Sequence, residues 1–331
     1  MRAITYQRDN DTFSLSELPT PKLETQFDVL VKVNAVGLNP VDAKIHYWSD
    51  MVTNMDNNFV GGLDVSGEIV SVGDAVVDWK VGDKVLYHGN MRRHHGGFAE
   101  FAIHDSRTLI KHPQVPVEVA ASTPCAAWTA YRALVDKLDI SNRSSIFIAG
   151  GAGGVGSFAI QLAKTFGVEQ IIATSSKANH AYLSSLGATH TIDYHHEDVV
   201  QRVMDITGNH GVEVALDCVG GDNDRIAASV LTFEGEMVEL VKTVDPSQYP
   251  DAFLKGLGFH QISLGSGHVF GERGLASIVT AGKEVSELLE NGELEVPKLK
   301  IIGLEDVGNA LLDMRNQRTV GKIVVNLTKN N

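Results

Sequence analysis

One glycine-rich segment, residues 150–156 (Gly-Gly-Ala-Gly-Gly-Val-Gly), constrains this chain more than any other feature. It follows an apolar run over 145–149 and precedes an amphipathic run over 155–166, so we predict a strand, a tight turn and a helix. The G-x-G-x-x-G spacing suits a turn where the backbone approaches a diphosphate and helix and strand pack closely. The positive end of the helix then favours the phosphates. The residues predicted to form this dinucleotide site are Gly151, Gly153, Gly154, Val155 and Gly156.

The chain around that turn alternates between predicted strands and helices. Gly167 ends the first helix, and a strand over 170–173 follows it at once. Helical patterns then separate the remaining predicted strands, which cover 189–192, 212–217, 237–241 and 261–264. Six strands alternating with helices favour a doubly wound parallel sheet of the α/β class.

The residues before and after this region have a different pattern. Residues 1–120 show short alternating strands separated by glycine turns, which predicts a β-barrel-like domain. The chain after 267 is mostly helical until a last strand over 322–327, which we expect to rejoin the first domain. The sheet region is then an insertion.

The end of the second predicted strand distinguishes between nicotinamide cofactors. NAD sites place an Asp or Glu there to bind the ribose 2′-hydroxyl, whereas this chain has Thr174, Ser175, Ser176 and Lys177. Hydroxyls and a lysine can hold a 2′-phosphate that a carboxylate would repel. The sequence therefore favours NADPH over NADH, with Tyr194 flanking the same phosphate; an ordinary helix-capping role for these residues stays open. FAD is less favoured because the fingerprint is internal to the chain.

Composition limits the partners and the compartment. The net charge of −13 over 331 residues argues against a nucleic acid or an acidic membrane surface as partner. Two distant cysteines, Cys125 and Cys218, predict no disulfide framework and indicate a reducing, cytoplasmic setting. The first residues read as a strand and not as a signal peptide, and we see no apolar stretch of the ~20 residues that a membrane span requires.

Several segments, taken in order, resemble the medium-chain dehydrogenase/reductase superfamily, in its zinc-independent quinone oxidoreductase branch. They are residues 37–42, 62–69, 81–85, 96–101, 128–131, 151–156, 217–220 and 320–322. The resemblance implies a GroES-like domain of residues 1–124 and 268–331, a Rossmann NADP-binding domain of residues 125–267, and a homodimer. It also implies cofactor contacts from Cys218, Val219, Gly220, Leu264, Gly265, Ser266 and Lys322, although Lys322 could instead face solvent.

The same resemblance bears on metal. Zinc members of the superfamily carry Cys, His and Cys where this chain has Asn39, Leu63 and Cys125. A catalytic zinc needs three protein ligands, so one sulfur is insufficient and we expect no metal. The four-cysteine structural zinc lobe is missing as well, because the chain has only two cysteines.

Without a metal, an activated acceptor such as a quinone or an α,β-unsaturated carbonyl is the expected substrate, reduced by hydride from NADPH. Asn39 would donate to the developing oxyanion, and Tyr47 would shape the pocket or relay a proton from the same helix face. Lys44 is a further cation on that helix. Pure helix capping by Asn39, an enoyl-thioester substrate, and a non-catalytic NADPH-binding protein remain alternatives.

Overall fold

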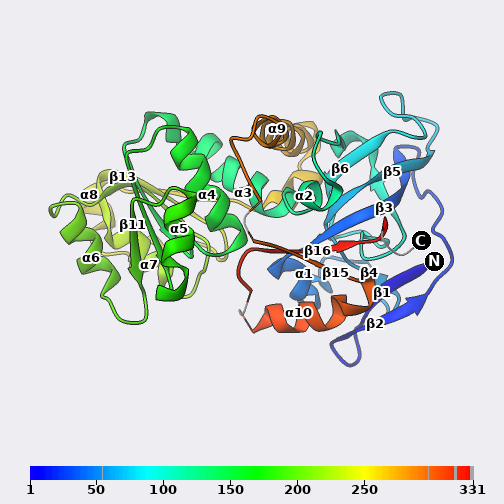
Figure 1. Ribbon diagram of the computed structural model, residues 1–331, viewed down its shortest axis with the longest axis horizontal. Helices are drawn as coiled ribbons and strands as arrows, with labels where there is room; N and C mark the ends of the chain where they lie inside the picture. The colour runs from blue at the N-terminus through cyan, green and yellow to red at the C-terminus, as the bar shows by residue number, and fades with distance from the viewer. Residues whose placement is uncertain (54, 297, 317–318, 329–331) are drawn as a thin grey trace. The chain divides into compact units, whose positions relative to one another are not determined.

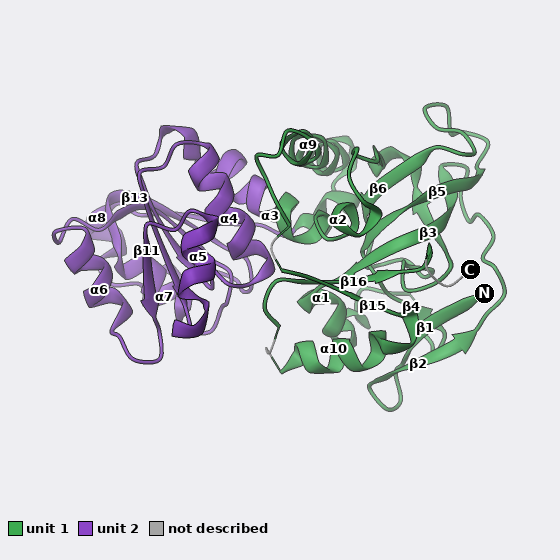
Figure 2. Ribbon diagram, viewed as in Figure 1, with its two compact units in different colours: residues 1–128, 264–331 green, residues 129–263 purple. Residues whose placement is uncertain are grey.

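The computed structural model describes residues 1–53, 55–296, 298–316 and 319–328. The chain forms two compact units (Figure 2). The first unit comprises Met1–Trp128 and Leu264–Asn331, and the second comprises Thr129–Ser263. The boundaries fall at 128 and 263, where the sequence analysis places them at 124 and 267. Residues 125–128 and 264–267 therefore belong to the first unit.

The first unit contains two sheets (Figure 1). A three-stranded sheet has the order β2-β1-β4, with β1 at Arg2–Gln7, β2 at Thr12–Glu17 and β4 at Phe59–Val60. The larger sheet has the order β15-β16-β3-β5-β6-β8, and β7 pairs with β3. Its strands are β3 (Asp28–Leu38), β5 (Asp64–Val72), β6 (Lys84–His88), β7 (Phe101–Asp105), β8 (Ile110–Lys111), β15 (Leu299–Ile302) and β16 (Lys322–Asn326).

Strand β3 shows why these segments fold as they do. Val29, Val31 and Val33 are buried, whereas Lys32 is exposed, so side chains alternate between core and solvent as the period of a strand requires. The buried valines join the first unit's main apolar cluster, together with residues of β5 and β16. The C-terminal strand thus completes the N-terminal β-domain, as the sequence pattern predicts.

Four α-helices of the first unit are α1 (Pro40–Ala43), α2 (Val117–Ala121), α9 (Gly271–Glu290) and α10 (Val307–Arg315). The helix expected from Asn39 to Tyr47 is wrong in length: α1 stops at Ala43, because Lys44 leaves the helical conformation with φ −96° and ψ 25°. A short 3₁₀ turn, Ile45–Trp48, follows. Asn39 and Tyr47 consequently do not share one helix face.

The second unit is a six-stranded parallel sheet in the order β11-β10-β9-β12-β13-β14. This is the doubly wound order expected for a dinucleotide-binding sheet, so the predicted α/β class is confirmed. The strands are β9 (Ser145–Ala149), β10 (Gln170–Ser175), β11 (His190–Asp193), β12 (Val212–Asp217), β13 (Leu231–Glu239) and β14 (Gly258–Gln261). The sixth strand therefore lies three residues before its predicted position at 261–264, and Leu264 instead begins a helical turn in the first unit.

The helices of the second unit are α3 (Thr129–Tyr131), α4 (Gly154–Thr165), α5 (His180–Leu186), α6 (Val199–Ile206), α7 (Asn223–Ser229) and α8 (Ala252–Lys255). The central strand β9 is buried at all five positions, as expected for a parallel sheet covered on both faces. Across the described part of the chain, no helix combines the length and apolar character that crossing a bilayer would require.

Candidate functional site

The glycine-rich turn lies between β9 and α4, at the carboxyl edge of the parallel sheet. Gly150 has φ +80°, a left-handed conformation that glycine adopts without steric cost. The amides of Gly154, Val155 and Gly156 precede the first hydrogen bond of α4, which Ser157 N donates to Gly153 O at 3.0 Å. The helix therefore begins with amides that have no helical acceptor, which is the arrangement that binds phosphate.

Steric space around the glycines tests whether a diphosphate fits there. A Cβ on Gly156 would lie 2.3 Å from Gly150 O, so helix and strand can approach this closely only without a side chain. A Cβ on Gly153 would meet only Gly150 O within 4 Å, at 3.4 Å, so space remains open above the helix end. The geometry thus fits the expected use of the turn: one glycine packs against the strand and another leaves room for a ligand.

Two neighbouring segments support this turn. Thr174 accepts the Gly150 N–H through Oγ1 at 3.0 Å and the Gly151 N–H through its carbonyl at 2.9 Å. In the loop after β12, Asp217 Oδ1 accepts the amides of Val219 and Gly220 at 2.8 and 3.1 Å. A Cβ on Gly150 would lie 2.6 Å from Val219 Cγ2, so this loop lies directly against the turn. Cys218 in the same loop is half-buried, and burial raises the pKa of its thiol.

The residues expected to select the cofactor lie at the ends of adjacent strands, since Ser175 of β10 pairs in register with Asp193 of β11. Thr174 and Ser175 are buried, and Ser175 Oγ donates to Ser176 O at 3.0 Å, so neither hydroxyl is directed to solvent. Ser176 is half-buried and Lys177 is exposed. Of the four expected phosphate ligands in this segment, the last two are therefore accessible.

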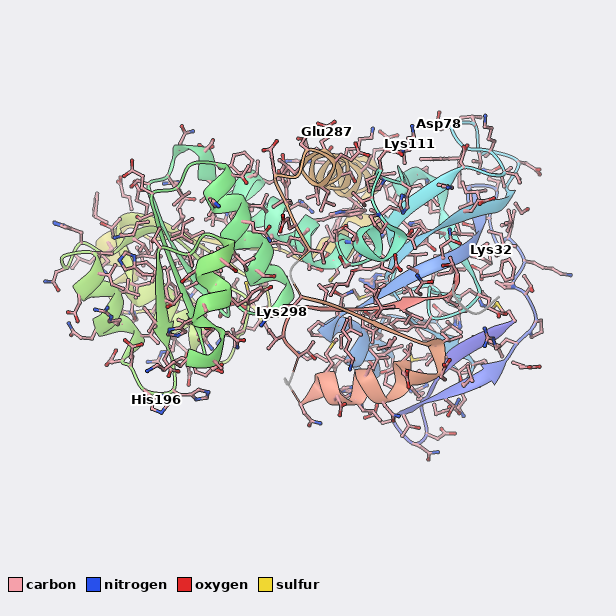
Figure 3. The ribbon with its side chains drawn as sticks, in the orientation of Figure 1. Lys32, Asp78, Lys111, His196, Glu287 and Lys298 are labelled. Carbon is pink, nitrogen blue, oxygen red and sulfur yellow. The ribbon has the colours of Figure 1, made fainter. Side chains whose placement is uncertain are left out.

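The loop after β11 contains Tyr194, which the sequence analysis places near this phosphate, and two histidines that it did not assign. Tyr194 is 52% exposed, with its ring centroid 4.2 Å from that of His195. His196 projects outward (Figure 3) and its Nδ1 lies 2.7 Å from Asp193 Oδ2. That hydrogen bond, with the His195 amide, lowers the pKa of Asp193. The carboxylate at this edge is therefore held within its own loop, beside two imidazoles.

A second group of polar residues lies in the first unit, where the pairing of neighbouring strands brings residues of separate strands together. Gly37 pairs with Asp64 across β3 and β5, and Asp64 pairs with His88 across β5 and β6. On the other side of β3, Leu38 pairs with Ile323, which brings the adjacent Lys322 next to Asn39. Four strands thus contribute to one row, which we call the buried polar cluster: Asn39, Asp42, Asp64, His88, Cys125 and Lys322.

Hydrogen bonds connect this cluster around the Asn39 side chain. Asn39 Nδ2 donates to Asp64 Oδ2 at 2.8 Å, and Asn39 Oδ1 accepts from Lys322 Nζ. The Lys322 ammonium also lies 3.7 Å from Asp64 Oδ2 and 3.3 Å from Leu38 O. Asp64 Oδ1 accepts the Cys125 backbone amide at 2.8 Å. Lys322 is only 3% exposed, which contradicts the solvent-facing alternative.

Asp42 and Asp64 therefore lie in a low-dielectric environment, with the Lys322 ammonium close to Asp64. Burial and the charge of Asp64 raise the pKa of Asp42 to about 8, against the opposing effect of Lys322. Burial also raises the pKa of Asp64 to about 6, although Lys322 and Asn39 act to lower it. Asp42 Oδ2 accepts the Asn39 amide at 3.0 Å and so fixes the start of α1. Asn39 is thus both an N-terminal helix residue and the centre of the cluster.

The positions that hold zinc in the family that this chain resembles do not fit a metal here. The Asn39 side chain is engaged on both its oxygen and its nitrogen. Leu63 is apolar and 3% exposed, so it offers no ligand atom. Of those three positions, Cys125 alone carries a strong zinc ligand, whose thiol pKa is raised by burial.

The remaining predicted site residues of the first unit are not members of this cluster. Lys44 is exposed, and Tyr47 is 69% exposed with its ring against His46. Leu264, Gly265 and Ser266 lie in a helical turn of the first unit. A Cβ on Gly265 would lie 3.7 Å from His88 Cε1, so this turn borders the buried polar cluster.

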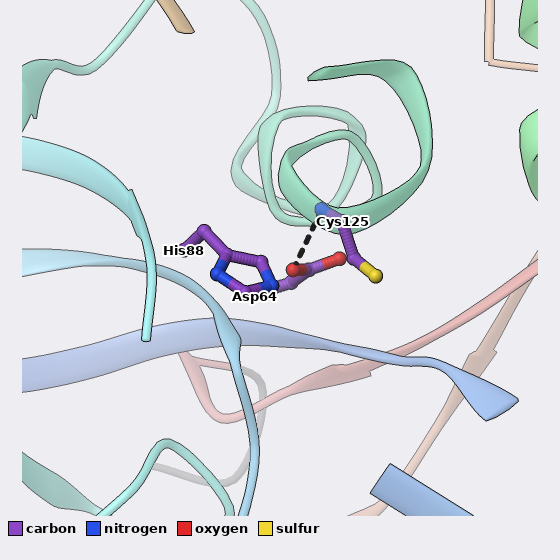
Figure 4. A group of neighbouring side chains, drawn as sticks. All are labelled: Asp64, His88 and Cys125. Atoms are coloured by element: carbon purple, nitrogen blue, oxygen red, sulfur yellow. Dashed lines mark hydrogen bonds between the residues drawn. The ribbon is translucent and has the colours of Figure 1, made fainter. Parts of the chain in front are cut away.

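The sequence analysis assigns no role to Asp64 or His88. Asp64 is fully buried and accepts two hydrogen bonds, one of them from the Cys125 amide (Figure 4). A signal was present for both residues, because an ionisable side chain within an apolar strand is rare unless it has partners. The register that joins them is not visible in the sequence.

Comparisons with known proteins agree with this architecture. Residues 25–114 match the family model of the alcohol dehydrogenase GroES-like domain, and residues 154–281 match that of the zinc-binding dehydrogenases. The chain is 31% identical to a 2-methylene-furan-3-one reductase of Solanum lycopersicum, over 90% of this chain and 71% of the relative. It is 30% identical to a chloroplastic NADPH-dependent alkenal/one oxidoreductase of Arabidopsis thaliana, over 94% and 74%. A crystal structure of a Pseudomonas syringae quinone oxidoreductase superposes with a TM-score of 0.84 at 26% identity, covering 98% of this chain and 99% of the other.

Proposed function

This chain belongs to the medium-chain dehydrogenase/reductase superfamily, in its quinone oxidoreductase-like branch, and on that premise we propose that it is an NADPH-dependent reductase of quinones or α,β-unsaturated carbonyls. Its relatives are oxidoreductases of these classes. The observation that carries the proposal is the turn between β9 and α4, with Gly150 in a left-handed conformation and open space above Gly153.

The choice of NADPH rests on the ends of β10 and β11. Ser176 and Lys177 are accessible there, and Tyr194 lies on the neighbouring strand end. An ammonium and hydroxyls suit a 2′-phosphate, and Asp193, which would repel one, is paired with His196. We also assign His195 and His196 to the surroundings of this phosphate, because they belong to the same loop.

The nature of the acceptor follows from what the buried polar cluster can and cannot supply. Asn39 and Leu63 provide no metal ligand at the family's positions, so a simple ketone would lack strong polarisation. A conjugated carbonyl or quinone stabilises the added electron pair on its own oxygen. The bound cofactor supplies hydride from nicotinamide C4, and one proton from solvent completes the reduced product.

In this proposal the Lys322 ammonium positions the Asn39 side chain by donating to its amide oxygen. Asp64 accepts one of the two N–H groups of Asn39 Nδ2, and the other N–H stays available. That second N–H is the group we assign to stabilise developing negative charge. Lys44 and Tyr47, which are both exposed, keep their assignment as residues that contact the substrate.

The test is an acceptor panel read by loss of NADPH absorbance. Cyclohexenone and cyclohexanone form the decisive pair, since they differ only in conjugation, and benzoquinone and crotonyl-coenzyme A extend the panel. We expect turnover of cyclohexenone or benzoquinone and none of cyclohexanone. Turnover of cyclohexanone would refute the acceptor class, and preference for crotonyl-coenzyme A would assign an enoyl-thioester reductase instead.

The Gly153→Asp variant is the matched control for the cofactor site. Its carboxylate would occupy the open space above the helix end and repel phosphate, so NADPH binding should be lost. Retained NADPH affinity in the folded variant would place the cofactor elsewhere. If NADPH binds to the wild-type protein and no acceptor is reduced, the chain is a binding protein and not a reductase.

A further inference from the structure

Two carboxyl groups lie side by side at the carboxyl edge of the parallel sheet in the second unit. Asp217 is the last residue of β12 and Glu239 is the last residue of β13, and the two are paired in register across these adjacent strands. Asp217 is 0% exposed and Glu239 is 1% exposed. Side chains at paired positions of neighbouring strands point to the same face of a sheet, so the two acids share one buried environment.

Backbone amides occupy one oxygen of each acid. Asp217 Oδ1 accepts the two amides of the loop after β12 that are described above. Glu239 Oε1 accepts the amides of Val241 at 2.6 Å and Lys242 at 3.0 Å, in the loop after β13. The other two oxygens, Asp217 Oδ2 and Glu239 Oε2, are buried, and no N–H or hydroxyl donor among the described residues reaches either of them. Each acid therefore shapes the loop that follows its own strand and keeps one oxygen for the other acid.

One proton accounts for these two oxygens. A hydrogen bond between the Glu239 and Asp217 side chains can form only when one of the two carboxyl groups is protonated and donates to the other. Burial, and then the hydrogen bond and charge of Asp217, raise the pKa of Glu239 to about 7, so Glu239 holds this proton. A hydrogen bond from a protonated carboxyl group to a carboxylate is roughly twice as strong as one between neutral groups. Once the proton is lost, two like charges meet in a buried site and repel each other.

The other titratable groups around the pair keep their charge near neutral pH. Lys242 Nζ lies 2.9 Å from Asp224 Oδ2, which also accepts the Tyr249 hydroxyl at 2.8 Å. Although burial opposes it, these hydrogen bonds lower the pKa of Asp224. Burial, and then the bond to Asp224, raise the pKa of Tyr249, and burial raises that of the Cys218 thiol. The in-register neighbours on the flanking strands are uncharged: Ala149 of β9 and Gln261 of β14. Among these groups, the pair is the one that changes charge near pH 7.

The two loops that the pair shapes border the glycine turn. A Cβ on Gly150 would lie 2.6 Å from Val219 Cγ2, and a Cβ on Gly220 would lie 2.7 Å from Val241 Cγ1. The loop after β12 therefore contacts the turn, and the loop after β13 contacts the loop after β12. Val219 is 42% exposed and Val241 is 46% exposed, so both present apolar surface at the edge of the sheet where the turn lies. A change in the pair is thus transmitted to the turn through two direct contacts.

We propose that Asp217 and Glu239 are positioning residues, which share one proton and thereby hold both loops in the arrangement that binds NADPH. This inference rests on the proposed function, because the cofactor is assigned to the adjacent turn. Loss of the proton places two like charges at the base of the loops, so the loops separate and Val219 moves relative to the turn. The diphosphate is itself anionic and favours the protonated pair. The affinity for NADPH therefore falls as pH rises through about 7.

Calorimetric titration with NADPH between pH 6 and pH 8.5 tests this role. We expect the wild-type affinity to fall by about tenfold or more over this range, and we expect the fall to be absent in Glu239→Gln. Glutamine keeps an acceptor for the two loop amides and replaces the shared proton with a permanent N–H donor to Asp217. Glu234→Gln is the matched control, because it removes an exposed carboxyl group from the same strand, and it should keep the wild-type profile.

The comparison between variants carries the test, because the 2′-phosphate and the nearby His195 and His196 also titrate. These groups are the same in every variant, so they contribute equally to each profile. Asp217→Asn is a second variant, in which the amide N–H donates to Glu239 from the other strand, and it should flatten the profile as well. It keeps the inference testable if Glu239→Gln does not fold.

The outcomes separate this inference from the proposed function. Binding of NADPH with the same pH dependence in the wild type and in Glu239→Gln would overturn the positioning role alone. A protein that binds no NADPH at any pH would refute the proposed function and the positioning role together. The shared proton has its own readout in the cofactor-free protein, an infrared band of a protonated carboxyl group that titrates near pH 7. That band should be absent from Glu239→Gln, and its absence from the wild type would overturn the shared proton.

Discussion

Lys322→Met is the substitution whose effect can be worked out most fully. The ammonium is 3% exposed and lies 3.7 Å from the fully buried Asp64 carboxylate, while its Nζ also donates to Asn39 Oδ1 and Leu38 O. Methionine keeps the length and apolar volume of the stem, so the loss is confined to the charge and its hydrogen bonds. Removing one partner of a buried ion pair costs about 3–5 kcal/mol.

That cost converts to a measurable shift in the melting temperature. For a domain of this size about 2–4 °C is lost per kcal/mol, so we expect the first unit to melt roughly 10 °C lower in Lys322→Met. The matched control is Lys300→Met on the adjacent strand β15, where the lysine is exposed. Surface substitutions usually change stability by less than about 0.5 kcal/mol, so this control should melt like the wild type.

A double-mutant cycle identifies the partner. If Asp64 is the charge that Lys322 neutralises, Asp64→Asn combined with Lys322→Met should cost less than the sum of the single variants, by about 1–3 kcal/mol. Calorimetry or urea unfolding measures all four proteins. Equal melting of Lys322→Met and wild type, or strict additivity in the cycle, would refute the buried ion pair as a stabilising element.

Three further outcomes follow from the second unit. Gly156→Ala should weaken NADPH binding at least tenfold and cost about 1–3 kcal/mol of unfolding free energy, because the added Cβ would lie 2.3 Å from Gly150 O. Unchanged NADPH binding, measured by calorimetry, would contradict this close packing. Lys177→Ala should lose about 1.5–3 kcal/mol of NADPH affinity and none for NADH, and an equal loss for both cofactors would remove its assignment to the 2′-phosphate. Burial and the facing Asp217 raise the pKa of Glu239 to about 7, so the folded state binds its proton more tightly than the unfolded state, and the stabilisation is lost as pH rises from about 4.5 through 7. Glu239→Gln should therefore show a smaller loss of melting temperature between pH 5.5 and pH 8 than the wild type, and parallel pH profiles would exclude this group.

The sequence predicts the second unit well because its determinants are local. A buried strand, a glycine turn and an amphipathic helix follow one another within 145–165, and each has its own spacing signal. The errors also have local causes. The helix after Asn39 is shorter than the predicted span to Tyr47, because Lys44 leaves the helical conformation. The sixth strand ends at Gln261, and residues 264–269 form a helical turn in the first unit.

The buried polar cluster was not predictable in this way. Its members lie on five separated segments, and they meet only through the antiparallel register of β3, β5, β6 and β16. A shift of one residue in the pairing of β3 with β5 would turn Asp64 to the opposite face of the sheet. Period and composition identify the strands, but pairing register is fixed by the packing of the whole core, which the sequence does not display.

The cluster also shows how a buried carboxylate obtains its counter-charge from a distant part of the chain. Asp64 is a fully buried residue of β5, and the free-energy cost of burying its charged form is offset when a positive charge lies beside it. The Lys322 ammonium supplies that charge from β16, 3.7 Å from the carboxylate oxygen. The same ammonium donates to the Asn39 amide oxygen, so the counter-charge of Asp64 also holds Asn39 in place. A comparison of the family's ligand positions alone misses this arrangement, because Lys322 does not lie at one of those positions.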